Sequence, residues 1–283
     1  MPSWFASCIV PAVPSKCYVR AAIVLAYLFA VRALEAETVR VRHAEGLVRG
    51  FLVLKSLDGA LIASGDLIQT TKGDRVTSRL VLHFKDGSVQ DETSVFTQTD
   101  RFRLVRDQMI QSGPSFPKPI DISLDAAAGR VTVRYREDGK DKTIDTQMAL
   151  PEDLANGIVL TLLKNMAPGT SPSNVSMLFA TPKPRLANLV ITRAGEDPFS
   201  SGGVEYKATR FNVKVELGGV AGVVAPLIGK QPRDTSVWIL EGEAPGFIGS
   251  EGPMYESGPL WRMELASPSM LKRSLAPEPA VTR

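Results

Sequence analysis

Cysteine and histidine are scarce in this 283-residue chain, which has two of each. Cys8 and Cys17 both precede an apolar run near the N-terminus, so the sequence beyond that run holds no thiol. Disulfides, cysteine nucleophiles and thiolate metal sites are thereby excluded from the remainder. His43 and His83 alone do not supply the clustered ligands of a zinc site. We therefore expect neither a metal nor another cofactor.

An excess of one charge sign is also missing. The chain has 33 Lys and Arg against 30 Asp and Glu, a formal net charge of +3. Nucleic-acid-binding domains normally carry a basic stripe or patch, so we expect no nucleic acid as partner. Hydrophobic residues make up 44% and charged residues 22%, which is typical of a globular protein rather than a disordered one.

The N-terminus has the pattern of a secretory signal peptide. Lys16 and Arg20 precede an apolar run at 21–31, and small residues follow up to Ala36. The run is too short to cross a bilayer as a helix. We predict that residues 1–36 are a signal peptide cleaved near Ala36, that the mature chain has no transmembrane segment, and that the protein is periplasmic or secreted. The alternatives are a buried element or an uncleaved anchor at 21–31.

Turn signals recur between alternating apolar and polar runs from Leu47 to about Met148. Asp-Gly pairs at 58–59, 86–87 and 138–139 are typical of hairpins. The pattern predicts an antiparallel meander with strands of about 10 to 12 residues, long enough for a curved sheet or partial barrel. In one strand, the alternation places Val76, Ser78, Leu80, Leu82 and Phe84 on one face and Arg75, Thr77, Arg79, His83 and Lys85 on the other.

A single helix is predicted at about 151–166. Pro151 is tolerated as a first helical residue, and Glu152 and Asp153 suit the helix N-terminus. Pro168-Gly169 would end the helix. Its apolar face has helical spacing and comprises Leu154, Ile158, Leu162 and Met166.

Strand patterns return after the helix. We expect residues 37–268 to form a single, mainly β domain, in which a long antiparallel meander makes a curved sheet or partial barrel around the central helix. Residues 269–283 are predicted to be a flexible tail. Prolines interrupt the sheet at 113–119, because proline lacks the amide that a strand ladder needs. The later strands are predicted at 174–181, 185–193, 204–217, 235–241, 245–250 and 259–266.

Catalytic motifs are weak. Ser250 lies between glycines, but Ile248 occupies the position where a nucleophile elbow requires glycine. Asp91, Glu92 and Asp107 fall in neighbouring predicted strands, near arginines at 79, 103 and 106. Paired carboxylates could perform acid and base catalysis on a glycoside. The alternative is cross-strand ion pairing on a half-exposed face.

Aromatic residues gather near the C-terminus. Trp238, Phe247, Tyr255 and Trp261 lie among prolines, so large apolar rings stand beside rigid loops. Such rings supply contact area in ligand pockets, and the alternative is packing in the core.

The order of leader, meander, single apolar helix beginning near 150–154 and second meander resembles the periplasmic half-barrel proteins of the lipoprotein carrier and receptor families. It is also similar to a bacterial domain of unknown function of the same build. The likeness is architectural and covers roughly 45–266. It implies a curved antiparallel sheet over helices, with an interior that accepts an acyl chain. This chain differs in having one predicted central helix rather than several.

Three functions follow as hypotheses. The first is a non-enzymatic envelope protein that binds a lipid or other hydrophobic or amphipathic small molecule between the sheet and the helix. The second is a structural or interaction protein that contacts an envelope partner through a sheet edge or the loops 113–119 and 244–259, and a filled core would favour it. The third is a carboxylate-based hydrolase, which requires a pocket at Asp91, Glu92 or Asp107. For the first, the predicted ligand-binding residues are Leu162, Met166, Leu227, Trp238 and Trp261.

Overall fold

The computed structural model describes residues 39–167, 169, 172–179, 184–201, 204–216 and 232–266. Contacts divide the chain into two compact units, Met1–Glu35 and Ala36–Arg283, and every described residue belongs to the second. Within the described ranges, no helix has the length and apolar character needed to cross a membrane. The predicted signal peptide, Leu227 and the predicted tail lie outside these ranges.

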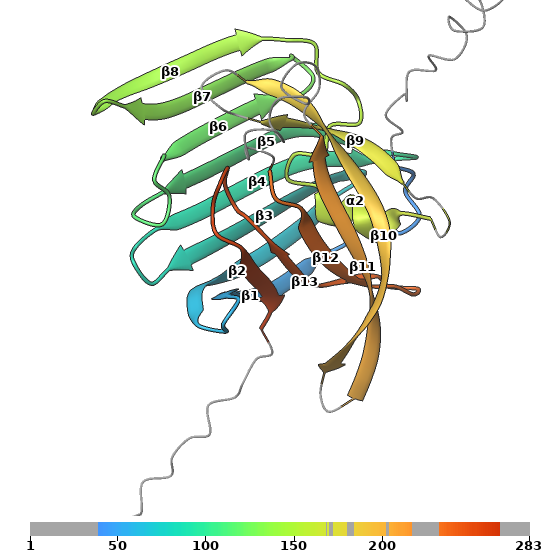
Figure 1. Ribbon diagram of the computed structural model, residues 1–283. Coiled ribbons are helices and arrows are strands. Elements are labelled where there is room, and N and C mark those ends of the chain that lie inside the picture. Colours follow the sequence, from blue (N-terminus) through green and yellow to red (C-terminus); the bar gives the residue numbers. More distant parts are fainter. Residues whose placement is uncertain are drawn as a thin grey trace, which may run out of the picture. The chain divides into compact units, whose positions relative to one another are not determined.

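The described residues form one open, antiparallel sheet of 14 strands with a short helix, α2 (Figure 1). The mainly β fold class is thereby confirmed. The sheet order is β8-β7-β6-β5-β4-β3-β2-β1-β14-β13-β12-β11-β10-β9, so β8 and β9 are its edges. The elements are β1 (Val48–Ser56), β2 (Leu61–Lys72), β3 (Arg75–Phe84), β4 (Val89–Gln98), β5 (Phe102–Ser112), β6 (Ile120–Asp125), β7 (Arg130–Glu137), β8 (Lys140–Gln147), α2 (Val159–Asn165), β9 (Ser173–Phe179), β10 (Arg185–Ser201), β11 (Val204–Glu216), β12 (Thr235–Leu240), β13 (Gly246–Gly252) and β14 (Trp261–Leu265).

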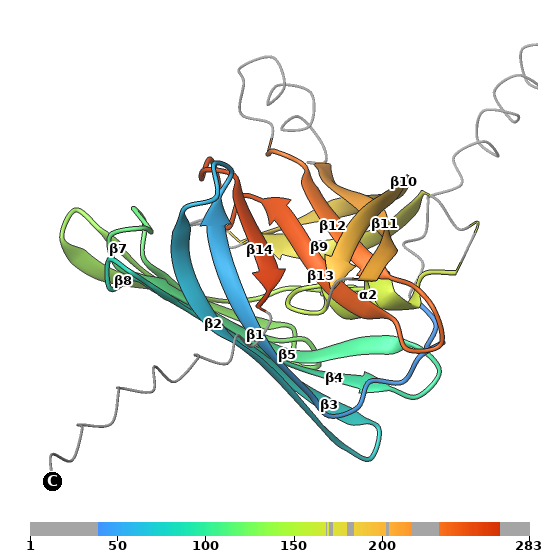
Figure 2. The ribbon, with the colours of Figure 1, turned by 90° about the horizontal axis from the view of Figure 1, so that it is seen from below.

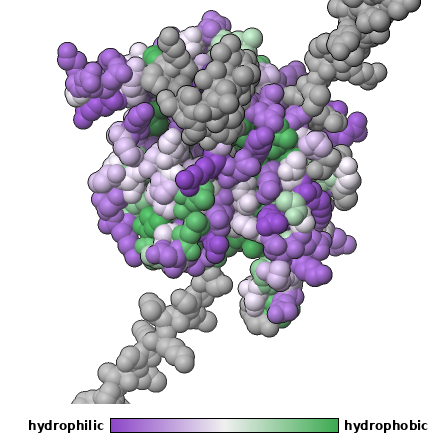
Figure 3. All heavy atoms as spheres, viewed as in Figure 1, coloured by the Kyte–Doolittle hydropathy of each residue, from purple (hydrophilic) through white to green (hydrophobic). Residues whose placement is uncertain are grey.

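Alternation of side chains along the strands decides which face of the sheet is buried. In β3, Val76 and Leu82 are fully buried, whereas Arg79 and His83 on the opposite face are exposed. The predicted faces of this strand are therefore confirmed. The side viewed in Figure 3 is mostly hydrophilic with separate apolar areas, and the outer face of β1 and β2 carries the exposed apolar residues Phe51 and Ile68.

The first and last strands along the chain, β1 and β14, lie side by side in the sheet. β1 pairs with β14 from Leu52 opposite Leu265 to Ser56 opposite Trp261. This pairing joins the two meanders into one sheet. The sheet is curved. Figure 2 shows its part formed by β9 to β14 lying over β3 to β5, with α2 between the two parts. The inner face is the one that encloses α2.

The helix is shorter than predicted, because it begins at Val159 rather than near Pro151. Gly157 adopts a left-handed φ of 64°, which interrupts a helix at that point. Before it, the chain runs along the open edge of β9. Leu154 forms a parallel bridge with Ser176, and the Asn156 side chain bonds both the N–H and the C=O of Leu178. Residues 153–156 therefore cover a sheet edge instead of forming a helical turn.

The core lies between the two curved parts of the sheet. Leu162, Leu163 and Met166 from α2 and its C-terminus are almost fully buried. They belong to one cluster with side chains from both meanders, including Phe96 and Phe211. The helix thus fills the space that the curved sheet encloses.

Candidate functional site

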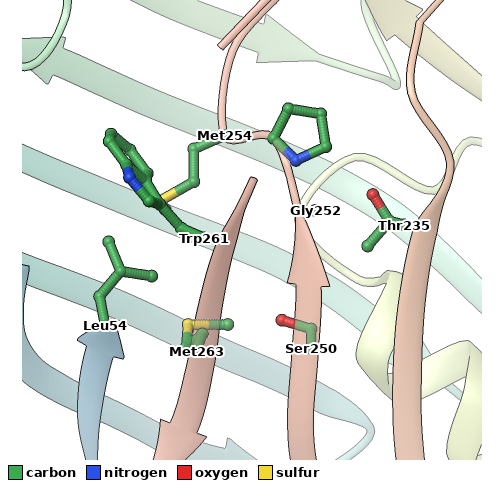
Figure 4. A pocket seen from close by; sticks show the side chains of 8 residues that line it. Leu54, Thr235, Ser250, Gly252, Met254, Trp261 and Met263 are labelled. Carbon is green, nitrogen blue, oxygen red and sulfur yellow. The ribbon is translucent and has the colours of Figure 1, made fainter. Parts of the chain in front are cut away.

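A small hollow lies on the inner face beside Trp261 (Figure 4). Its volume is about 70 Å³. The lining is mainly apolar, with two hydroxyl groups, and none of its eight residues has a titratable side chain. These residues are Leu54, Thr235, Ser250, Gly252, Pro253, Met254, Trp261 and Met263.

Strand register explains why these residues meet. Met263 of β14 lies opposite Leu54 of β1 on one side and Ser250 of β13 on the other. Because facing residues in antiparallel strands share a face, all three side chains point inward. Gly252 is required nearby, since a Cβ there would collide with the Thr235 hydroxyl. The sheet itself therefore builds the base of the hollow.

Trp261 forms a rigid aromatic wall. Its side chain packs against Phe84 at a ring distance of 5.5 Å and against Tyr255 at 6.2 Å. In Figure 4 the Met254 side chain lies beside the Trp261 ring, and Met263 lies beside Ser250. Methionine side chains are flexible and adapt to the shape of a bound apolar group. The hollow combines a fixed ring with movable thioethers.

A second distinctive place on the inner face is a pair of carboxyl groups on β4 and β5, Glu92 and Asp107. Burial raises the pKa of Glu92 to about 8, and the neighbouring Asp107 carboxylate adds to the shift. Burial also raises the pKa of Asp107 to about 6, although a hydrogen bond donated by Ser94 Oγ at 2.7 Å opposes the change. The pair therefore retains a proton at neutral pH.

Gly157 covers the Asp107 carboxyl of this pair. A Cβ at position 157 would collide with Ser94 Oγ and lie 2.6 Å from Asp107 Oδ1. The backbone before α2 thus rests directly on Asp107 and leaves no room for a substrate at that point. Raised pKa values often mark active sites, but here they accompany close packing.

The three predicted carboxylates do not converge. Asp91 lies on the outer face, where its two oxygens accept hydrogen bonds from Arg79 at 2.9 and 2.5 Å. Glu92 is the next residue and points inward, because successive strand residues alternate faces. Asp91 thus forms the cross-strand ion pair that was the alternative to catalysis, while Glu92 and Asp107 lie on the inner face.

The outer face has a shallow hollow of about 300 Å³ over β3, β4 and β5. It contains the ion pair of Arg79 with Asp91 and the side chains of Thr93, Gln108 and Ile110. These groups are exposed or half-buried, and the carboxylate is already paired. The hollow is a polar surface depression of the sheet.

The five predicted ligand-binding residues lie in different surroundings. Leu162 and Met166 come together in the packed core, and Trp261 lines the hollow. Trp238 lies on the outer face, because its strand neighbours Val237 and Ile239 are the buried ones, and its indole N–H donates to Asp197 Oδ2 at 2.7 Å. Leu227 lies outside the described residues.

Sequence reasoning missed Leu54 and Met254 as lining residues. Met263 could have been found, because the alternation at 261–265 places it on the same face as Trp261. Leu54 reaches the hollow only through the pairing of β1 with β14, for which no local pattern exists. Among the described residues, no group of three or more His, Cys, Asp or Glu could hold a metal ion.

Comparison with known proteins found one distant structural likeness. No protein-family model matches the chain, and no curated protein matches it. The chain is similar to a solved β-barrel-like protein from Brucella abortus that belongs to a domain of unknown function, DUF1849. The two share 11% sequence identity with a TM-score of 0.42, over 81% of this chain and 97% of that one.

Proposed function

We propose that this chain is a non-enzymatic, exported binding protein of the bacterial envelope. It takes the apolar end of an amphipathic ligand in the hollow beside Trp261. The observation that carries the proposal is the lining of that hollow, which is apolar, adaptable and without a titratable group. Such a site supplies contact area and two hydroxyls but no acid or base for catalysis.

The size of the hollow limits what enters it. Pockets for whole small-molecule ligands measure roughly 300 to 1,000 Å³, whereas this hollow measures about 70 Å³. The space between sheet and helix is occupied by Leu162, Leu163 and Met166. The ligand in this proposal is therefore held by one short apolar group at the inner face, with the rest of the molecule outside.

Export is part of the proposal because of the N-terminal pattern. The apolar run at 21–31, preceded by Lys16 and Arg20, is typical of a secretory leader. An envelope location also supplies amphipathic molecules as ligands. N-terminal sequencing of the protein recovered from a periplasmic extract tests this part, and we expect the chain to begin at Glu37.

Native mass spectrometry of that periplasmic sample tests ligand binding. We expect an added mass of lipid size that disappears after organic extraction. The extracted protein should then bind an added decanoyl or dodecyl amphiphile and show the mass of that compound. A bare polypeptide before extraction, together with no uptake of either amphiphile, would remove the hollow as a binding site.

A second candidate function is an interaction protein without a small ligand. The specific observation in its favour is the part of β10 and β11 that extends beyond the neighbouring strands and carries the exposed ring of Tyr206 stacked on Phe199. The core between sheet and helix is filled by Leu162, Leu163 and Met166, and a filled core also favours this function.

A further inference from the structure

β10 and β11 extend past their neighbours in the sheet. Within the described residues, β9 pairs with β10 only over 185–191, and β12 pairs with β11 only over 209–213. Residues 197–201 and 204–208 therefore pair only with each other in the described part of the sheet, and we call them the arm. Figure 1 shows these ends of β10 and β11 projecting beyond the other strands.

The arm exposes apolar surface. The rings of Phe199 and Tyr206 stack at a centroid distance of 5.4 Å. Tyr206 is 42% exposed and Val204 is 53% exposed. A two-stranded ribbon is only marginally stable in water on its own. The arm is nevertheless anchored at its base, where Asp197 accepts the Trp238 indole N–H and pairs with Arg210.

The two free edges of the arm are not equivalent. Pro198 of β10 lies opposite Lys207 of β11. Proline has no N–H, and within a sheet its nitrogen faces the unpaired edge. The β10 edge is thereby blocked against another strand.

The same parity leaves the β11 edge open. If the backbone groups of Pro198 face away from β11, those of Lys207 face away from β10, because facing residues in an antiparallel pair behave alike. Glu205 has the same parity as Lys207. Their N–H and C=O groups therefore point to the free edge, two residues apart, as a pairing strand requires.

We propose that the arm is a self-association surface, at which β11 pairs antiparallel with β11 of a second copy of this chain about a two-fold axis at Tyr206. In this register Tyr206 faces the partner's Tyr206, and the exposed Val204 lies opposite the partner's Ala208, whose side chain is already buried in its own copy. Glu205 then faces the partner's Lys207, and Lys207 faces the partner's Glu205. A two-fold axis requires a self-complementary surface, and this sequence of charges provides it.

The two faces of such a joint differ. Tyr206 and Phe199 from both copies would lie together on one face, which covers the exposed rings. The two ion pairs would lie on the other face. The contact is short, so the dimer is weak and forms at micromolar concentrations rather than nanomolar ones.

A charge-reversal series measured by sedimentation equilibrium tests the proposal. Glu205→Lys or Lys207→Glu alone places like charges opposite each other, and we expect the dimer to weaken about tenfold. The double variant with both changes restores opposite charges and should restore the wild-type dissociation constant. Lys140→Glu on the β8 edge is the control, with no effect expected.

A cysteine pair gives an independent readout. In a chain with Cys8→Ser and Cys17→Ser, Tyr206→Cys is the only thiol. Opposed residues in antiparallel strands have Cα atoms about 4.5 to 5.5 Å apart, within disulfide range. Mild oxidation should therefore crosslink Tyr206→Cys and not Lys140→Cys.

Several outcomes would overturn the proposal. These are a monomer up to about 100 µM, a dimer that ignores the charge reversals, and crosslinking at position 206 no greater than at 140. The proposal is independent of the proposed function, so a failure to detect ligand binding at the hollow beside Trp261 leaves these measurements unaffected. Pairing with a strand of a different protein would appear as a monomer in these experiments and counts against it.

Discussion

The hollow beside Trp261 and the carboxyl pair on β4 and β5 occupy the same inner face of one sheet, yet they are opposites. The hollow is apolar, partly empty and without a titratable group. The pair consists of two carboxyl groups with raised pKa values, and Gly157 lies directly on one of them, Asp107. Shifted pKa values alone would select the second place as the site. The combination of space and chemistry selects the first, because a ligand needs room before it needs an acid.

If the carboxyl pair is a packing feature, a substitution at Gly157, which packs on Asp107, should give the largest loss of folding stability. Gly157→Ala adds a Cβ that collides with Ser94 at a left-handed φ. We expect the free energy of unfolding to fall by about 4 kcal/mol, measured by urea denaturation. Gly59→Ala is the control, because φ is 90° there but the space is open, and it should cost about 1 kcal/mol. Similar losses in both variants would show that the contact at Gly157 carries no special weight.

The carboxyl pair should also make stability depend on pH. The folded-state pKa of Glu92, about 8, lies above the ordinary glutamate value of 4.5, so the neutral form is favoured on folding. Its stabilisation is complete below 4.5 and is lost as the pH rises to 8. We expect the unfolding free energy to fall by on the order of 2 kcal/mol between pH 5 and 8.

Glu92→Gln should flatten that pH profile, because an amide has no proton to lose. Asp91→Asn, on the outer face, should leave the profile unchanged apart from loss of the pair with Arg79. Urea denaturation at pH 5, 6.5 and 8 provides the comparison. A wild-type profile that rises over this range would mean that the pair is ionised and stabilised in the folded protein.

Filling the hollow should separate binding from stability. Ser250→Leu places an apolar side chain in space that is already present, so we expect little change in stability and at least about a tenfold loss of amphiphile affinity. Thr93→Leu places the same side chain in the outer hollow and should not alter affinity. Isothermal titration with a dodecyl amphiphile distinguishes them. Equal affinity in all three proteins would place the binding site elsewhere.

The smallest effect is expected on the outer face. Arg79→Ala removes an exposed ion pair with Asp91, and such pairs contribute about 0.2 to 1 kcal/mol. We expect a loss in this range that shrinks with added salt, with ligand affinity unchanged. A much larger loss would mean that the outer hollow is part of the working surface.

Local patterns predicted the strands well, because alternation and turn chemistry are properties of neighbouring residues. The inward face of β3, the single apolar segment before the second meander and the shared face of Trp261 and Met263 all follow from them. Two features depended on contacts that no local pattern encodes. These are the pairing of β1 with β14, which brings Leu54 to the hollow, and the edge contact of residues 153–156 with β9.

The errors have local physical causes. Leu154, Ile158 and Leu162 have helical spacing, but Gly157 and the side chains of Asp153 and Asn156 favour backbone contacts over a helical turn. β10 continues to Ser201 rather than ending at 193, because an irregularity between Arg193 and Glu196 interrupts the alternation without ending the strand. The β10 half of the arm was therefore missed, whereas the β11 half lies within the predicted strand at 204–217.

Fluorescence of Trp261 tests the proposed site most directly. The chain has three tryptophans, so Trp4→Phe with Trp238→Phe leaves Trp261 as the only emitter, and Trp4→Phe with Trp261→Phe leaves Trp238. On titration with a dodecyl amphiphile below its micelle concentration, we predict a saturable change in emission from Trp261 and none from Trp238, which faces the other side of the sheet. A change confined to Trp238, or no change in either protein, would contradict binding at the hollow.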